Sequence, residues 1–269
     1  ALHDPNSQQQ KGSYQPLIIN HEIVNLPSIT SLATQRAELA KRPTAPKPLA
    51  VLADPVFQAN DERITGKPQT IVPELDLSQE IEKSVLDKTA RSLNKRDGVE
   101  RLPYTKDEAE AILKLVNNTQ TRQAIGFDAT YEWATNRELK QYRFLHFATH
   151  GFANPENPER SGIVLSLLDK QGKPTAKGYL RLGDIFNLEF GADLVVLSAC
   201  QTGLGKNIKG EGILGLTRGL MYAGTPRAAV SLWDVNDLGT SVLMEKFYKQ
   251  MLSGGKTPAT ALRTAQLEM

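Results

Sequence analysis

The sequence has a single cysteine, Cys200, in 269 residues, so no disulfide can form within the chain. A chain without disulfides fits a reducing compartment, which predicts a cytoplasmic location. The two signs of charge are nearly balanced, because 32 basic and 30 acidic residues give a net charge of only +2. This balance provides no strong attraction to nucleic acid or to an anionic membrane, so we expect neither as a direct partner.

Long apolar runs and nucleotide-binding patterns are also missing. No apolar run reaches the roughly 18 residues that a membrane span needs, and the N-terminal stretch ALHDPNSQQQKGS lacks the apolar centre of a secretory signal. No GxGxxG or P-loop pattern opens a helix after a strand, so we expect no nucleotide and no other cofactor. The helix predicted for TPATALRTAQLEM stops without a cap, which indicates a fragment of a longer protein.

What remains is an ordinary globular composition, 40% hydrophobic and 23% charged, long enough to bury a large core. Residues 1–13 are predicted to be disordered, and residues 14–269 to form one domain. The alternating pattern of residues 14–28 predicts a hairpin or two short strands, and a helix is predicted at residues 28–42. LAVLADP, at residues 49–55, is typical of a strand that is buried on both faces of a parallel sheet.

A long charged insertion is expected at residues 56–101, helical around residues 80–93 and otherwise mobile. It carries a run of basic residues: Lys88, Arg91, Lys95, Arg96 and Arg101. Charge runs usually form a solvated face. The alternative is an exposed segment for cleavage or docking.

Strands and helices alternate after the insertion. Strands are predicted at RQAIGF, YRFLHFATHG, SGIVLSLLD, ADLVVLSAC and RAAVSLW, and helices at TKDEAEAILKLV, ATYEWATNREL, RLGDIFNL, GEGILGLTRGLMYAG and DLGTSVLMEKFYKQML. This alternation predicts an α/β fold with a mostly parallel sheet that is covered by helices on both faces.

Two of these strands end in reactive residues. One delivers His150 and Gly151, and another delivers Cys200. Ligands gather beyond the carboxyl ends of parallel strands, so neighbouring strands would bring the thiol and the imidazole together as a nucleophile and its proton partner. The backbone N–H groups of Gly151 and Cys200 would then stabilise an oxyanion. The alternative for Cys200 is an inert buried thiol.

His146 lies four residues before His150, a spacing that raises the question of a metal site. A zinc site of the HExxH type needs a helix and a glutamate after the first histidine, whereas Phe147 stands there and no third ligand is evident. We therefore expect no metal, and a packed or hydrogen-bonded His146.

The motifs LHFATHG, DLVVLSACQTGLG, GEGILGLTRGLMYAG and AVSLWDVND together resemble the CHAT family, caspase-like domains usually attached to tetratricopeptide repeats and related to separases and caspases. The interval of 50 residues between His150 and Cys200 is similar to that of caspases, although Ser198 stands where their QAC signature has glutamine. The resemblance implies a caspase-like three-layer α/β/α sandwich, a dyad of His150 and Cys200, and Gly151 as the glycine of the oxyanion hole.

The resemblance also implies a specificity pocket at residues 231–237, and Ser198 is a further candidate for substrate binding. Trp233 would wall this pocket or belong to the core, and Asp234 stands where the family often has proline. A carboxylate there would favour a basic residue before the scissile bond, but Asp234 or Asp237 could instead cap the following helix. Glu211 would lie near the active loop or act as a first-turn partner of the helix dipole.

The resulting hypothesis is a cysteine endopeptidase for protein or peptide substrates, regulated by a repeat region or partner protein outside this chain, with self-cleavage in the basic insertion. The alternative is an inactive caspase-like scaffold for protein–protein interaction. A thiol acyltransferase or amidase would use the same dyad.

Overall fold

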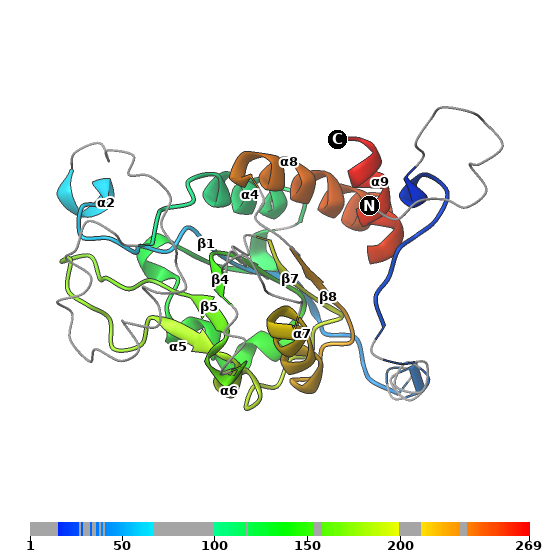
Figure 1. Cartoon of the computed structure of the whole chain (residues 1–269), viewed down its shortest axis with the longest axis horizontal. Coiled ribbons are helices and arrows are strands. Elements are labelled where there is room, and N and C mark those ends of the chain that lie inside the picture. Colours follow the sequence, from blue (N-terminus) through cyan, green and yellow to red (C-terminus); the bar gives the residue numbers. More distant parts are fainter. Residues whose placement is uncertain are drawn as a thin grey trace. The chain divides into compact units, whose positions relative to one another are not determined.

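The structure, a computed structural model, describes most of the chain (Figure 1). The described residues are 16–26, 28, 33, 36–37, 39, 41–66, 99–116, 118–152, 158–198, 211–231 and 236–269. The predicted disordered segment 1–13 and the helix predicted around residues 80–93 lie outside them. The chain divides into a larger unit, residues 43–241, and a smaller unit formed by residues 1–42 and 242–269.

A five-stranded parallel sheet forms the centre of the larger unit. In sheet order its strands are β2 (Thr121–Ile125), β1 (Lys47–Ala53), β3 (Tyr142–Ala148), β7 (Leu194–Leu197) and β8 (Ala228–Val230). Each neighbouring pair is parallel. The three central strands are almost wholly apolar because both faces of the sheet are covered. The predicted mostly parallel sheet is therefore confirmed.

Helices cover both faces of this sheet. They are α4 (Tyr104–Leu113), α5 (Tyr131–Ala134), α6 (Leu182–Ile185) and α7 (Glu211–Tyr222), with α2 (Glu62–Thr65) after β1. Short 3₁₀ segments lie at Asn118–Gln120, Gly126–Asp128, Arg137–Gln141 and Pro158–Arg160. Figure 1 shows α4 on one side of the sheet and α5, α6 and α7 on the other. This three-layer arrangement is the predicted α/β/α sandwich.

The alternation of side chains along the strands determines what each face packs against. One face carries Leu52 and Phe147, which belong to a buried cluster with Leu216 and Leu220 of α7. The opposite face packs against α4, which contacts both β1 and β3. The strands are thereby held rigidly from both sides, and so are the residues that follow their carboxyl ends.

A second, antiparallel sheet follows β3. It consists of β4 (Gly151–Phe152), β5 (Gly162–Val164) and β6 (Tyr179–Arg181). The strand predicted at residues 161–169 is shorter than predicted and lies in this sheet, not in the central one. It pairs with β6 at very close range, because a Cβ atom at Gly162 would lie 2.2 Å from the carbonyl oxygen of Leu180.

The helix predicted at residues 129–139 is divided into α5 and the 3₁₀ segment Arg137–Gln141. The side chain of Asn136 accepts a hydrogen bond from the N–H of Glu138 at 2.9 Å, and this bond starts a new helical segment. A capping residue inside the predicted helix therefore breaks it.

The smaller unit contains α9 (Pro258–Leu267), a π-helical segment Lys249–Ser253 and a 3₁₀ turn, η2 (Leu17–Ile19). The boundary between the units falls within α8 (Asp237–Tyr248). Arg263 of α9 donates hydrogen bonds to the carbonyl oxygens of Ile18 and Ile19, and these bonds hold the turn. Of the helix predicted at residues 28–42, the described positions 33, 36, 37 and 39 are helical, and the described positions 28, 41 and 42 are not.

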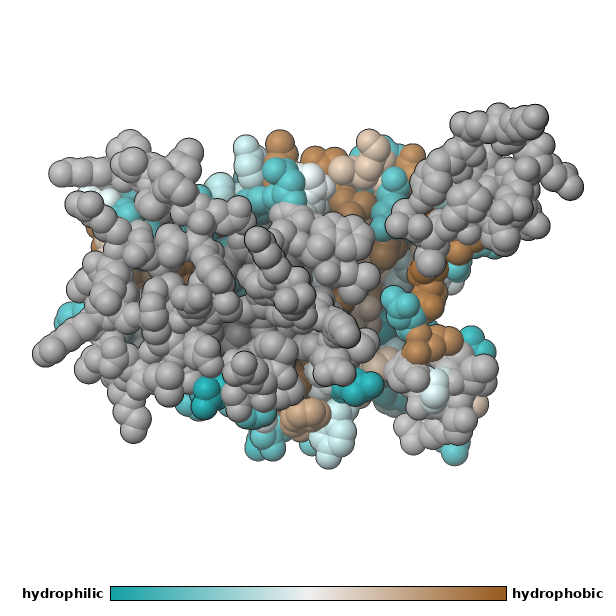
Figure 2. All heavy atoms as spheres, viewed as in Figure 1, coloured by the Kyte–Doolittle hydropathy of each residue, from teal (hydrophilic) through white to brown (hydrophobic). Residues whose placement is uncertain are grey.

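The strands predicted at residues 14–28 are wrong for the described part of that segment. Residues 17–19 form η2, and residues 21–26 form no strand. Ile23, Val24 and Leu26 are exposed, and apolar side chains appear in brown along this segment in Figure 2. The alternating pattern therefore buries no apolar face here.

No helix among the described residues is long and apolar enough to cross a membrane.

The substitution Gly162→Ala should lower the free energy of unfolding by about 2–4 kcal/mol, because the added methyl group would overlap the Leu180 carbonyl. Gly183→Ala is the matched control, since a Cβ atom at this exposed helical position has no neighbour within 4 Å. It should leave stability unchanged or raise it by up to about 1 kcal/mol. Urea denaturation measures both effects, and equal midpoints for the two variants would contradict the close β5–β6 packing.

Candidate functional site

The pairing of β3 with β7 brings two predicted site segments to the same edge of the sheet. Phe147 pairs with Leu197, and the N–H of Ser198 donates to the carbonyl oxygen of Phe147 at 3.1 Å. The strands that lead to His150 and to Cys200 are thus neighbours, which is the condition that the predicted dyad requires. Residues 199–210 lie outside the described residues, and Cys200 is among them.

His150 is buried, with 2% of its surface exposed. Its Nε2 lies 2.7 Å from the backbone carbonyl oxygen of Glu100. A carbonyl oxygen can only accept, so Nε2 carries the proton and donates it. The other nitrogen, Nδ1, is then an unprotonated acceptor, and it has no hydrogen-bond partner in the described part of the chain. The Glu100 carbonyl therefore selects the tautomer in which Nδ1 can take up a proton.

Burial also sets the charge of His150. It lowers the pKa of the imidazole from 6.5 to about 4, against a smaller opposite effect of the hydrogen bond to Glu100. The ring of Phe57 lies 5.3 Å from the imidazole, centroid to centroid, and contributes to this apolar environment. His150 is therefore neutral at pH 7.

The backbone around His150 is held by the antiparallel sheet. The N–H of Val164 donates to the carbonyl oxygen of His150 at 2.8 Å, and the hydroxyl of Thr149 donates to the carbonyl of Val164 at 2.6 Å. Gly151 begins β4 and pairs with Ile163. The predicted oxyanion-hole glycine thus stands at the start of a hydrogen-bonded strand, directly after His150.

His146 belongs to a different, closed arrangement. Its Nε2 lies 2.6 Å from Oε1 of Glu108 on α4, and both side chains are fully buried. The interpretation of His146 as a packed, hydrogen-bonded residue is confirmed. Within the described ranges, no three His, Cys, Asp or Glu side chains are grouped so that they could hold a metal ion.

Ser198 and the predicted pocket segment meet beside β7. The hydroxyl of Ser231, which follows β8, donates to the carbonyl oxygen of Ser198 at 3.2 Å. The Ser198 hydroxyl is buried and has no hydrogen-bond partner among the described residues. The start of the predicted specificity segment therefore lies at the same edge as the ends of β3 and β7. Trp233 and Asp234 lie outside the described residues, and Glu211 begins α7.

Asp237 does not cap its own helix, so that alternative from the sequence is wrong for this residue. The cap of α8 is Asn236, whose side chain accepts from the N–H of Gly239 at 2.9 Å. Asp237 instead accepts from the N–H of Tyr104, the first residue of α4, at 3.0 Å. Burial, together with the carboxylates of Glu108, Asp54 and Asp107, raises its pKa to about 6, against the effect of the Tyr104 hydrogen bond.

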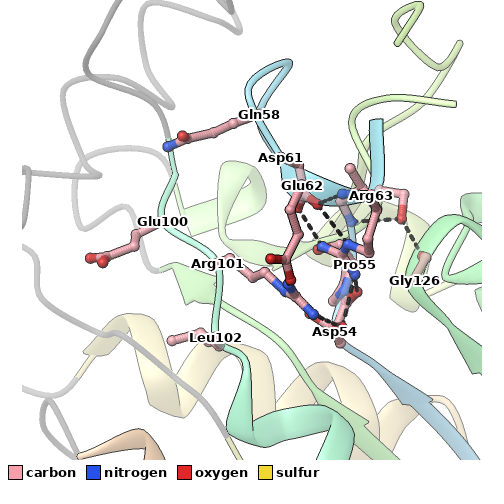
Figure 3. Close-up of polar contacts among 12 residues, drawn as sticks. Asp54, Pro55, Gln58, Asp61, Glu62, Arg63, Glu100, Arg101, Leu102 and Gly126 are labelled. Atoms are coloured by element: carbon pink, nitrogen blue, oxygen red, sulfur yellow. Dashed lines mark hydrogen bonds and ion pairs between the residues drawn. The ribbon is translucent and has the colours of Figure 1, made fainter. Parts of the chain in front are cut away.

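Sequence reasoning missed an ion-pair cluster at the carboxyl end of β1, formed by Asp54, Asp61, Glu62, Arg63 and Arg101 (Figure 3). Both guanidinium groups bind the carboxylate of Asp54, at 2.8 to 2.9 Å. The available signal was an aspartate directly after a fully apolar strand.

The Arg101 side chain is only 16% exposed, so the interpretation of the basic run as a solvated face is wrong for this residue. Lys88, Arg91, Lys95 and Arg96 lie outside the described residues. Beside the cluster, a pocket of about 420 Å³ opens at the ends of β1 and β2, and Lys106 and Lys170 are also part of its wall.

The two shifted pKa values should affect stability in opposite directions as the pH falls. His150 takes up a proton near pH 6.5 in the unfolded chain but only near pH 4 in the folded chain. The free energy of unfolding should therefore fall by up to about 3 kcal/mol as the pH drops from 6.5 to 4. Asp237 takes up a proton near pH 6 in the folded chain but near pH 3.8 in the unfolded chain. Its effect is therefore to raise the free energy of unfolding as the pH falls through 6.

His150→Gln should therefore flatten the decline in the free energy of unfolding between pH 6.5 and 4, and Asp237→Asn should make it steeper. Urea denaturation at pH 7, 6, 5 and 4 measures both slopes. Slopes that match wild type in both variants would contradict these pKa assignments.

Comparison with known proteins places the whole chain in one family. The family model described as the CHAT domain matches residues 1–269. Tetratricopeptide repeat protein 28 of Mus musculus is 31% identical over 187 residues, and the protein of the same name from Homo sapiens is 31% identical over 186 residues. Each alignment covers 59% of this chain but only 7% of the relative. The match of the family model over the whole chain shows that the chain belongs to the CHAT domain family.

Proposed function

We propose that the chain is a cysteine endopeptidase in which His150 and Cys200 form the catalytic dyad. The observation that carries this proposal is the state of His150, which is buried at the carboxyl end of β3 with Nε2 bound to the Glu100 carbonyl and Nδ1 unprotonated. In the sequence, Cys200 follows Leu197, the last residue of the neighbouring strand β7, by three residues. A neutral base beside a thiol is the arrangement that nucleophilic catalysis requires.

In the proposed reaction, Nδ1 of His150 accepts the proton of the Cys200 thiol while the sulfur attacks the carbon of a peptide carbonyl. The imidazolium then donates that proton to the leaving amine as the C–N bond breaks, and a thioester remains. Water, deprotonated by the same nitrogen, hydrolyses the thioester and restores the thiol. The low pKa of His150 favours a neutral thiol and imidazole over an ion pair in the resting enzyme.

The developing oxyanion would be stabilised by the backbone N–H groups of Gly151 and Cys200. Gly151 stands directly after His150 and is held by its pairing with Ile163. The geometry of the donor pair would thus follow from the same two strands that carry the dyad.

We further propose that the pocket prefers a basic residue before the scissile bond, through Asp234 or Asp237. Tyr104, which binds Asp237, comes four residues after Glu100, which binds His150, so the two Cα atoms are at most about 14 Å apart. Because Asp237 binds the N–H of Tyr104 in this segment, we propose that it lies near a residue bound at the dyad. Ser198, Trp233 and Glu211 are the other candidates for the substrate-binding surface.

Regulation by a tetratricopeptide-repeat region outside this chain is also proposed. It is supported by the names of the relatives and by the small share of them, 7%, that this chain covers. The single cysteine supports a reducing, cytoplasmic location.

A peptide-library digest followed by mass spectrometry tests the activity. Wild type should cleave a subset of peptides, whereas Cys200→Ala and His150→Ala should each reduce cleavage by at least about 1,000-fold, because the dyad acts as a unit. If Asp237 sets the preference for arginine or lysine, that preference should weaken below pH 6, where its carboxylate is protonated. If Asp234 sets it, Asp234→Ala should abolish it.

Labelling with a peptide electrophile distinguishes the enzyme from an inactive scaffold. Because the chain has one cysteine, a single adduct on the intact protein identifies Cys200. Absence of both labelling and cleavage would contradict the endopeptidase and favour the scaffold. Acyl transfer or deamidation without peptide-bond cleavage would indicate the other thiol chemistries.

Self-cleavage, if it occurs, should fall after Arg91 or Arg96 and not after Arg101. The Arg101 side chain is bound to Asp54 and Glu62 and would have to leave both before it could enter a pocket. Intact-mass analysis of wild type and Cys200→Ala after incubation measures this. A break after Arg101 that depends on Cys200 would contradict the prediction.

A further inference from the structure

The segment that binds His150 is itself fixed from both ends. Gln58 donates a hydrogen bond from Nε2 to the carbonyl oxygen of Val99 at 3.0 Å, and Val99 packs in a buried cluster with Val56 and Phe57. On the other side of Glu100, Arg101 is held by the ion-pair cluster. The Glu100 carbonyl is therefore presented to His150 between two anchored residues.

The stronger anchor is the pair of Arg101 with Asp54. Nε and Nη2 of Arg101 each lie 2.9 Å from one carboxylate oxygen, so the contact is bidentate. A third donor, Nη1, binds Glu62 at 2.6 Å. Figure 3 shows the Arg101 side chain directed toward Asp54, whereas the Glu100 side chain extends away from the cluster. A fork of this kind fixes orientation as well as position.

Asp54 is in turn fixed to the strand that neighbours the one leading to His150. It directly follows β1, whose last residue, Ala53, pairs with Ala148 at the end of β3. Its side chain is 2% exposed. A continuous path of contacts thus runs from the end of β1 through Asp54, Arg101 and Glu100 to the imidazole at the end of β3.

We propose that Arg101 is a positioning residue, whose bidentate contact with Asp54 holds the Glu100 carbonyl against Nε2 of His150. The proton of the neutral imidazole then stays on Nε2, and Nδ1 is unprotonated. Calling His150 a catalytic base rests on the proposed function, but the control of its tautomer by Arg101 does not. The Arg101 guanidinium binds Asp54 and Glu62, not the imidazole, and Arg101 acts through the backbone of the residue before it.

Nitrogen-15 NMR of the histidine rings at pH 7 tests the tautomer in the full chain, with His150→Gln used to assign the signals. Wild type should show protonated Nε2 and unprotonated Nδ1 at His150. Arg101→Met should produce a mixture of the two tautomers and faster exchange of the Nε2 proton with water. Arg101→Lys keeps the charge but lacks the fork, so it should shift the tautomer in the same direction to a smaller extent.

Arg63→Met is the matched control, because it removes the same charge from the cluster and one partner of Asp54 without touching the backbone at Glu100. It should leave the His150 tautomer as in wild type. A wild-type tautomer in folded Arg101→Met, or an equal shift in Arg63→Met, would overturn the proposal. If Arg101→Met does not fold, Arg101→Lys decides, and a wild-type tautomer in that variant overturns the proposal.

Alkylation of Cys200 by iodoacetamide between pH 5 and 9 supplies the functional readout, since the sole cysteine is the only thiol. Arg101→Met should react at least about ten-fold more slowly than wild type near pH 6.5, and Arg63→Met should react at the wild-type rate. A wild type without peptidase activity but with the Arg101-dependent tautomer would refute the proposed function and retain the positioning role. Peptidase activity with a tautomer that does not depend on Arg101 would support the proposed function and refute the positioning role.

Discussion

The parallel pairing of β3 with both β1 and β7 is the constraint on which the rest of the molecule depends. Because all three strands run in the same direction, the residues that follow them meet at one edge: Asp54 after β1, His150 after β3 and Ser198 after β7. Helices on both faces hold these strands. Side chains that are far apart in the sequence can therefore form one site at the carboxyl ends of the parallel strands.

Burial at this edge has opposite electrostatic effects on its acid and base groups. His150 is kept neutral because a buried imidazolium would lose its hydration, and the Glu100 carbonyl decides which nitrogen carries the proton. Asp237 is made harder to ionise by the same loss of hydration and by neighbouring carboxylates. Pairs of groups whose environments move their pKa values in this way are frequent at functional sites, which favours a functional site at this edge of the sheet.

The sequence predicted those features that depend on local periodicity. The buried strand predicted at residues 49–55 corresponds to Lys47–Ala53, and another buried strand is Tyr142–Ala148. The pairing of β3 with β7 did not follow from periodicity, because strand order depends on contacts between distant residues. Features that depend on contacts between distant residues were missed, such as the pair of Asp54 with Arg101, 47 residues apart. A single capping side chain, Asn136, divided a predicted helix, and Arg263 of α9 holds a turn where strands were predicted.

The central claim is that Nδ1 of His150 faces the sulfur of Cys200. The most direct measurement is the distance between these two atoms in a crystal structure of the wild-type chain at pH 7. We expect about 3–4 Å, with Nε2 of His150 still bound to the Glu100 carbonyl. A separation of more than about 6 Å, too long for proton transfer even through one water molecule, would contradict it.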